Sequence, residues 1–190
     1  ANMKQAVDGI IGAGYGSAGE RCMAVSVAVA VGDIADELVS NIHKESQKLK
    51  VAPWTDKDSD MGPLISKEHL EKVKGYIETG VKEGAILVED GRNFKLQGYE
   101  NGYFLGPTLF DKVKTDMTIY KEEIFGPVLS VVRVETYDEA IKMINRHPFG
   151  NGTSVYTNDG DIARHFTSHA KIGMVGVNVP IPVPMAFHSF

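Results

Sequence analysis

The stretch Gly14-Tyr15-Gly16-Ser17-Ala18-Gly19-Glu20-Arg21-Cys22-Met23 joins a predicted helix to a predicted strand. Its glycines allow the backbone to turn tightly and leave neighbouring N–H groups free to face a reacting oxygen. The run Met23–Val31 that follows has a valine at every second position, which predicts a strand. Residues 3–13 predict a short helix, so the chain opens as helix, glycine-rich bend and strand.

Strands and helices alternate along the rest of the chain. Further helices are predicted over Asp33–Leu49, with Asp33 as the N-cap, and from the N-cap Ser66 to Glu83, then over Thr136–Asn145 and Asp159–His169. Further strands are predicted over Ala85–Val88, Tyr103–Val113, Val128–Val134, Thr153–Thr157 and Ile172–Val179. This order predicts an α/β fold with an open, largely parallel, twisted sheet and helices on both faces.

Active sites of such sheets lie beyond the carboxyl ends of the strands. We therefore expect the bend before Cys22 and the loop before Val128 to meet at that edge.

Composition narrows the classes of function. With 190 residues and 43% hydrophobic content, the chain can form one domain with a sizeable core. A net charge of -5 gives no reason to expect nucleic acid or an anionic membrane as a partner. One cysteine excludes an internal disulfide framework and a CxxC metal or redox site. No apolar run in the sequence is long enough to span a bilayer.

Cys22 is the only cysteine of the chain. We interpret it as a catalytic nucleophile, because only a thiolate attacks and the neighbouring Arg21 supplies charge that favours the thiolate, although Glu20 opposes it. A buried structural cysteine is an open alternative, since free cysteines are commonly buried. An idle, buried Cys22 would fit a non-catalytic α/β binding or assembly module.

A second alternative concerns the glycines. Gly14-x-Gly16-x-x-Gly19 matches the dinucleotide-binding fingerprint, with the acidic residues Asp33, Asp36 and Glu37 downstream. That fingerprint requires a strand before it and a helix starting at its last glycine. Here a strand is predicted after Gly19, where the fingerprint requires a helix, so the match is weak.

Three stretches occur in a specific order: Gly19–Met23, Lys121–Pro127 and Gly173–Pro184. Together they resemble the catalytic domain of the aldehyde dehydrogenase superfamily. Within Glu-Glu-Ile-Phe-Gly-Pro, the second glutamate, Glu123, lies 101 residues after a glycine-led cysteine (123 minus 22). Arginine directly before the cysteine, Gly150–Thr153 and the proline-rich ending resemble more narrowly the CoA-acylating, methylmalonate-semialdehyde dehydrogenase branch. The likeness covers almost the whole chain.

The resemblance implies roles for four residues. Cys22 would attack the aldehyde carbon to give a thiohemiacetal, and its backbone N–H would help to hold the oxyanion together with an asparagine outside this chain. Hydride transfer to NAD would leave a thioester on Cys22, and CoA as co-substrate would take the acyl group after decarboxylation. Arg21 would bind the carboxylate of a small semialdehyde substrate. Glu123 would accept hydrogen bonds from the nicotinamide ribose, and Phe125 would pack beside that ribose.

Each of these residues also has a purely structural interpretation. Glu123 fits a solvated charged face, Phe125 fits a core side chain, and Arg21 fits an ion pair with Glu20 or another carboxylate.

The six histidines define no site. His165 and His169 would share one helical face, but the glutamate of the zinc-protease signature is absent, so no metal is expected. His188 stands where the resembling sequences usually carry apolar residues.

We expect residues 1–190 to be a catalytic, thiol-bearing domain and a fragment of a longer protein, since the chain lacks an initiator methionine and ends within an apolar stretch. The resemblance implies that an amino-terminal NAD-binding domain and a carboxy-terminal end lie outside it, so the fragment alone is expected to be inactive. It also implies a homo-oligomer, dimer or tetramer, in the cytoplasm, or in the mitochondrial matrix of a eukaryote. A hydrolytic, NAD(P)-dependent branch, in which water resolves the thioester, is the open alternative within the family.

Overall fold

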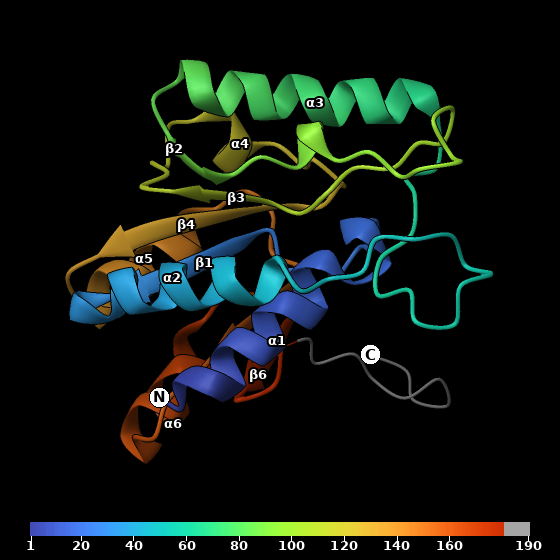
Figure 1. The fold of residues 1–190 in the computed structure, drawn as a ribbon. Helices are drawn as coiled ribbons and strands as arrows, with labels where there is room; N and C mark the ends of the chain where they lie inside the picture. Colours follow the sequence, from blue (N-terminus) through green and yellow to red (C-terminus); the bar gives the residue numbers. More distant parts are fainter. Residues whose placement is uncertain (181–190) are drawn as a thin grey trace.

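The structure is a computed structural model that describes residues 1–180. Its main sheet has the strand order β1-β4-β3-β2, where β1 is Val27–Val31, β2 is Ile86–Glu89, β3 is Thr108–Asp111 and β4 is Val128–Val134. β4 pairs in parallel with both β1 and β3, whereas β2 is antiparallel to β3. The predicted α/β class with a largely parallel sheet is confirmed (Figure 1).

Helices cover this sheet. The α-helices are α1 Met3–Tyr15, α2 Ala35–Ser46, α3 Lys67–Lys82, α4 Thr118–Lys121, α5 Tyr137–Arg146 and α6 Gly160–His169, with short 3-10 turns η1 Gly16–Gly19, η2 Gly32–Ile34 and η3 Gly91–Asn93. Both α2 and α5 pack against β1, and α3 packs against β2. A separate parallel pair, β5 Gly152–Val155 and β6 Met174–Val177, packs with α6 below the main sheet in Figure 1.

The central strand β4 forms the middle of the core. Its first five residues are all buried, because neighbouring strands and packed helices cover both of its faces. Leu129 and Val131 are fully buried, as are Leu109 and Phe110 on the adjacent β3. This largely apolar run, in which Ser130 is the one buried polar residue, explains why the Val128–Val134 prediction matches the observed strand bounds.

Several predicted boundaries are wrong. The strand predicted over Tyr103–Val113 covers only Thr108–Asp111, because it begins after Gly106-Pro107. The strand predicted over Met23–Val31 begins only at Val27, because the Ala24 N–H bonds to Arg21 in a turn and the Val25 N–H bonds to Ala13 at the end of α1. Asp33 is not the N-cap of α2: it lies within η2, and the cap residue Ile34 makes no side-chain capping bond.

The other capping predictions are confirmed. Ser66 accepts from the His69 N–H and Thr136 accepts from the Glu139 N–H. Asp159, predicted only as the start of its helix, also acts as a cap, since it accepts from two N–H groups in the first turn of α6.

Candidate functional site

The two loops predicted to meet do meet, but at the opposite edge of the sheet. Cys22 precedes β1 and Glu123 precedes β4, and these strands are parallel neighbours. Both loops therefore lie at the amino ends of their strands, away from the arrowhead of β4 in Figure 1. The expectation of a site at the carboxyl ends was wrong, because a loop that leads into a parallel strand can lie only at the edge where that strand begins.

An unusual backbone shapes the loop that carries the cysteine, residues 16–23, which we call the thiol loop. Ser17, Ala18 and Gly19 have φ values of +53°, +53° and +69°, so three successive residues are left-handed. Non-glycine residues in this region cost about 1–3 kcal/mol each and persist only where the surroundings hold them. This conformation reverses the chain after α1. It also contradicts the dinucleotide fingerprint, because a helix precedes the glycines and a turn and strand follow them.

Cys22 lies in the turn that ends this loop, and its side chain is exposed. The buried-cysteine alternative is therefore wrong. The Asn151 side chain donates to the Cys22 carbonyl oxygen at 2.9 Å, which fixes the peptide next to the sulfur. Within residues 1–180, no acceptor takes the backbone N–H of Cys22. That donor is thus available to a ligand oxygen.

The thiol loop touches the loop of residues 122–126, which we call the ribose loop after its expected partner. A Cβ on Gly19 would lie 2.2 Å from the carbonyl oxygen of Gly126, so the two backbones are in direct contact. Gly126 is itself confined, since a Cβ there would lie 2.8 Å from the Val73 side chain. Only glycine at both positions allows the loops to approach this closely.

Side chains of the ribose loop point in different directions. Ile124 is 5% exposed and fills the core, whereas Phe125 is 37% exposed and left-handed, with φ +60°. Phe125 is therefore not the core side chain that its sequence context also allowed. The Glu122 carboxylate accepts a 2.7 Å hydrogen bond from Tyr76, which raises the pKa of that phenol.

Glu123 is exposed and makes no hydrogen bond within the described residues. Of the two adjacent glutamates, it is the one whose carboxylate is available to a ligand. Carboxylate oxygens can accept hydrogen bonds from sugar hydroxyls, and a half-exposed ring offers a flat apolar surface beside them. Glu123 and Phe125 are thus suited to hold a nucleoside.

Arg21 does not pair with a carboxylate within residues 1–180. Its Nη2 donates to the carbonyl oxygens of Gly12 at 2.9 Å and Ala13 at 3.3 Å, at the C-terminal end of α1. A cation is favourable there because the carbonyl oxygens at the C-terminal end of a helix carry partial negative charge. The guanidinium therefore anchors the thiol loop to α1, and Nη1 has no partner in the described part of the chain.

Three contacts of this site, made by Glu20 and His69, were missed from the sequence. Glu20 turns away from Cys22, and its Oε1 accepts from the Ile65 N–H at 3.2 Å and lies 3.4 Å from Nε2 of His69. The same imidazole nitrogen is 2.6 Å from the Phe125 carbonyl oxygen. His69 sits on α3, 47 residues beyond the cysteine (69 minus 22), and no local motif marks it.

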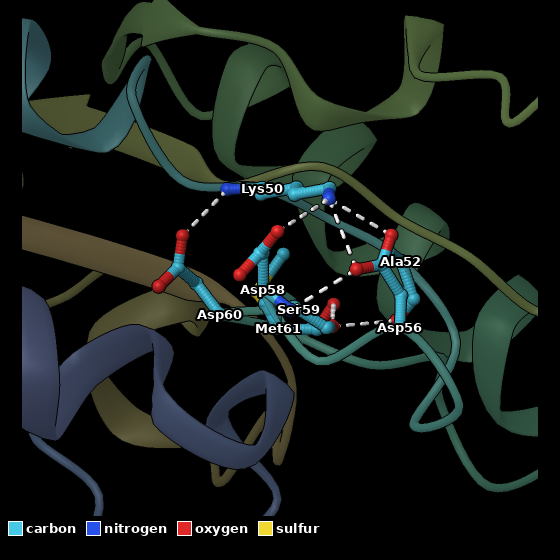
Figure 2. A network of polar contacts seen from close by, with 7 residues as sticks. All are labelled: Lys50, Ala52, Asp56, Asp58, Ser59, Asp60 and Met61. Carbon is cyan, nitrogen blue, oxygen red and sulfur yellow. Dashed lines mark hydrogen bonds and ion pairs between the residues drawn. The ribbon is translucent and has the colours of Figure 1, made fainter.

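A further loop, Lys50–Met61, follows α2 toward the same edge, and the Ile65 N–H beyond it reaches Glu20. Figure 2 shows Lys50 reaching across it: Nζ is 2.8 Å from Asp56 and 3.8 Å from Asp58, and the Lys50 N–H donates to Asp60. A parallel bridge between Val51 and Met61 closes its ends.

Trp54 extends from this closed loop and is 90% exposed. The charged groups and the bridge thus order a loop that presents an indole to solvent.

Two surface hollows of about 600 Å³ lie away from Cys22, one beside Leu49–Pro53 and Phe94–Leu96 and the other beside Thr157–Asp161. His165 and His169 stack at 3.9 Å, but residues 1–180 hold no group of three or more side chains placed to bind a metal ion. No helix among these residues could cross a membrane. Part of the Gly173–Pro184 stretch, and His188, lie outside the described residues.

Comparison with known proteins agrees with this geometry. The aldehyde dehydrogenase family matches residues 1–190. Malonate-semialdehyde dehydrogenases from Pseudomonas aeruginosa and Geobacillus thermodenitrificans are 54% and 53% identical over the whole chain. The chain spans 38% and 39% of the length of these relatives.

Solved structures give the same result. A methylmalonate-semialdehyde dehydrogenase from Oceanimonas doudoroffii matches all of the chain and 39% of its own, with 54% identity and a TM-score of 0.97. A betaine aldehyde dehydrogenase from Staphylococcus aureus in complex with NAD+ matches 97% of the chain and 36% of its own, with 32% identity and a TM-score of 0.92. The chain belongs to the aldehyde dehydrogenase family.

Proposed function

We propose that the chain is the catalytic, thiol-bearing part of an NAD-dependent, CoA-acylating malonate- or methylmalonate-semialdehyde dehydrogenase. The observation that carries the proposal is the contact between two loops. One presents an exposed cysteine, and the other presents a free carboxylate and a half-exposed ring. The names of the relatives favour the substrate, and the NAD complex of a related structure favours the cofactor.

In this proposal Cys22 attacks the aldehyde carbon, and the carbonyl π bond opens to an oxyanion. The Cys22 N–H, which no acceptor takes in the described residues, donates to that oxyanion. Asn151 holds the peptide that follows through its bond to the Cys22 carbonyl oxygen. The left-handed turn over Ser17–Gly19 sets the direction of this peptide before substrate binds, so little reorganisation is needed.

Glu123 and Phe125 would hold NAD, with the carboxylate accepting from ribose hydroxyls and the ring packing beside the sugar. NAD, when bound, supplies the hydride acceptor that converts the thiohemiacetal on Cys22 into a thioester. CoA as co-substrate then takes the acyl group and returns the Cys22 thiolate. For a malonate-type substrate, carbon dioxide leaves before this transfer.

Arg21 is proposed as the residue that binds the substrate carboxylate. Its Nη2 is engaged with the end of α1, which fixes the guanidinium one residue from Cys22 and leaves Nη1 without a partner in the described residues. We expect Arg21→Leu to raise the KM for a semialdehyde acid about tenfold more than the KM for propanal, because one charge-assisted bond is lost only with the acid. An equal change for both aldehydes would assign Arg21 to loop anchoring alone.

The experiment that tests the proposed function uses the purified full-length protein with malonate semialdehyde and NAD, with and without CoA. NADH absorbance reports oxidation, and mass spectrometry separates acyl-CoA from free acid. Acyl-CoA formation supports the proposal. Free acid formed without CoA would support the hydrolytic alternative, and absence of NADH would support a non-catalytic module.

Iodoacetamide labelling of Cys22 near neutral pH gives an independent measure. An activated thiol reacts faster than free cysteine, so slow labelling in the full-length protein would contradict a nucleophilic role.

Four further expectations belong to the same proposal. The remaining length of the relatives would supply an NAD-binding domain, and the isolated chain would be inactive. The full-length protein would be a dimer or tetramer and would act in the cytoplasm, or in the matrix of a eukaryotic mitochondrion.

A further inference from the structure

His69 lies between the thiol loop and the ribose loop. Its Nε2 is 2.6 Å from the Phe125 carbonyl oxygen and 3.4 Å from the Glu20 carboxylate. A carbonyl oxygen only accepts, so Nε2 carries a proton and donates to Phe125. The side chains of His69 and Glu20 are 16% and 15% exposed, which shields both contacts from water. One imidazole therefore connects the two loops.

Hydrogen bonds hold both residues of this contact in place. His69 is in the first turn of α3, where its N–H donates to the N-cap Ser66 at 3.2 Å. The same Glu20 Oε1 that faces His69 accepts from the Ile65 N–H, also at 3.2 Å. The imidazole is thus presented from a capped helix end, and a hydrogen bond holds the carboxylate that faces it.

Phe125 is a residue that needs such support. Its φ of +60° is strained for an aromatic residue, and strained residues persist only where their surroundings determine them. Ile124 on one side is anchored in the core, and Gly126 on the other is confined by Val73. The bond from His69 holds the Phe125 carbonyl between these anchors, and the two rings meet edge to face at 6.4 Å.

We propose that His69 and Glu20 are positioning residues for the cofactor. His69 holds the Phe125 carbonyl, and Glu20 holds the His69 imidazole, so that the Phe125 ring and the Glu123 carboxylate keep a fixed relation to Cys22. The inference rests on the proposed function, because it assigns the nicotinamide ribose of NAD to the ribose loop. Neither residue touches a reacting atom, so their loss changes the affinity and orientation of NAD while the reactivity of the thiol is retained.

Two variants of the full-length protein isolate the hydrogen bond. Glutamine places an amide nitrogen at about the reach of Nε2, whereas asparagine has the same amide on a side chain one methylene shorter. We expect His69→Asn to raise the Kd of NAD, measured by titration calorimetry, and the KM of NAD about tenfold, as loss of one shielded hydrogen bond predicts. His69→Gln restores both to within about threefold of the wild type, because the donor is kept.

Two controls distinguish a role of His69 in positioning NAD from a general disturbance of the active site. The rate of Cys22 alkylation by iodoacetamide without NAD stays within about twofold in both variants, because neither changes the charge beside the thiol loop's sulfur. Glu20→Gln keeps an acceptor for the Ile65 N–H but removes the charge that faces His69. We expect it to weaken NAD binding in the same direction and by less than His69→Asn.

Three results would overturn the inference. If His69→Asn had the wild-type affinity for NAD and the wild-type KM of NAD, the hydrogen bond from His69 would not be needed to position the ribose loop. An equal loss in the asparagine and glutamine variants would assign His69 to packing. A wild-type protein that neither binds NAD nor oxidises a semialdehyde would refute the proposed function and the inference together, whereas an active wild type with an unaffected His69→Asn would refute the inference alone.

Discussion

The thiol loop and the Lys50–Met61 loop lie toward the same edge of the sheet but are held by different forces. Left-handed backbone at Ser17–Gly19 and a backbone contact between Gly19 and Gly126 fix the thiol loop. The Lys50–Met61 loop is held by a backbone bridge between Val51 and Met61 and by exposed ion pairs, in which the Lys50 and Asp58 side chains are 47% and 87% exposed. Close packing holds the strained backbone of the thiol loop in a single conformation. Ion pairs on the surface, as in the Lys50–Met61 loop, are screened by salt and contribute little to the free energy of folding. The first loop should therefore be intolerant of substitution and the second tolerant.

The largest expected difference is in turnover. Cys22→Ala should lower kcat at least about a thousandfold, as removal of a nucleophile does in other enzymes that form covalent intermediates. Trp54→Ala in the Lys50–Met61 loop is the matched control and should leave kcat near the wild-type value. NADH formation by the full-length protein measures both. Comparable losses would show that the two loops do not differ in function.

Stability provides the second contrast. Gly19→Ala should lower the free energy of unfolding by about 3–5 kcal/mol, because its Cβ would meet the Gly126 carbonyl oxygen and alanine is strained at positive φ. Gly75→Ala on α3 has open space and should raise the free energy of unfolding by about 0.5–1 kcal/mol. Urea unfolding measures both. A neutral Gly19→Ala would mean that the close approach of the two loops is not required.

Within the ribose loop, the adjacent glutamates should behave differently. Glu123→Gln should raise the Kd of NAD about tenfold, as loss of a charged acceptor for ribose hydroxyls predicts. Glu122→Gln keeps an acceptor for Tyr76 and should leave the Kd near the wild-type value. Titration calorimetry on the full-length protein decides between them. A larger effect at Glu122 would exchange the proposed roles.

The smallest effect is expected in the Lys50–Met61 loop. The hydrogen bond from Lys50 lowers the pKa of Asp56, so the folded loop favours the charged form of the Asp56 carboxylate. The stabilisation is complete above the unfolded pKa of about 3.9 and is lost as the pH falls through the lower, folded value. Lys50→Met should weaken this dependence, although the Asp58 N–H still favours the charged Asp56 carboxylate, and should increase hydrogen exchange within residues 50–61, with no change in β4. If neither the variant nor 1 M salt changed hydrogen exchange in residues 50–61, the bridge between Val51 and Met61 would hold the loop without help from the ion pairs.

Local signals explain what the sequence could predict. The apolar run of β4 and the caps Ser66 and Thr136 act through neighbouring residues, and the structure confirms them. The glycines that precede Glu20-Arg21-Cys22 predicted the bend that carries the thiol, and the order of the strands predicted that this bend would meet the loop before Val128. The predicted position of these loops, at the carboxyl ends of the strands, was wrong, because a general rule for α/β sheets was applied to loops that precede their strands.

The remaining errors have non-local causes. The prediction of Asp33 as the N-cap of α2 was wrong because a 3-10 turn at Gly32–Ile34 moves the start of the helix to Ala35. His69 and Glu20 lie far apart in the chain, and only the packing of α3 beside both loops brings them together. No periodicity or spacing encodes that contact.

The central claim is that the Cys22 thiolate attacks the aldehyde carbon. Peptide mapping by mass spectrometry, after the full-length protein is mixed with malonate semialdehyde and NAD without CoA and quenched in acid, tests it directly. We predict an acyl adduct on the peptide that contains Cys22, formed only when NAD is present. An adduct on another residue, or NADH formation with the Cys22 peptide unmodified, would contradict the claim.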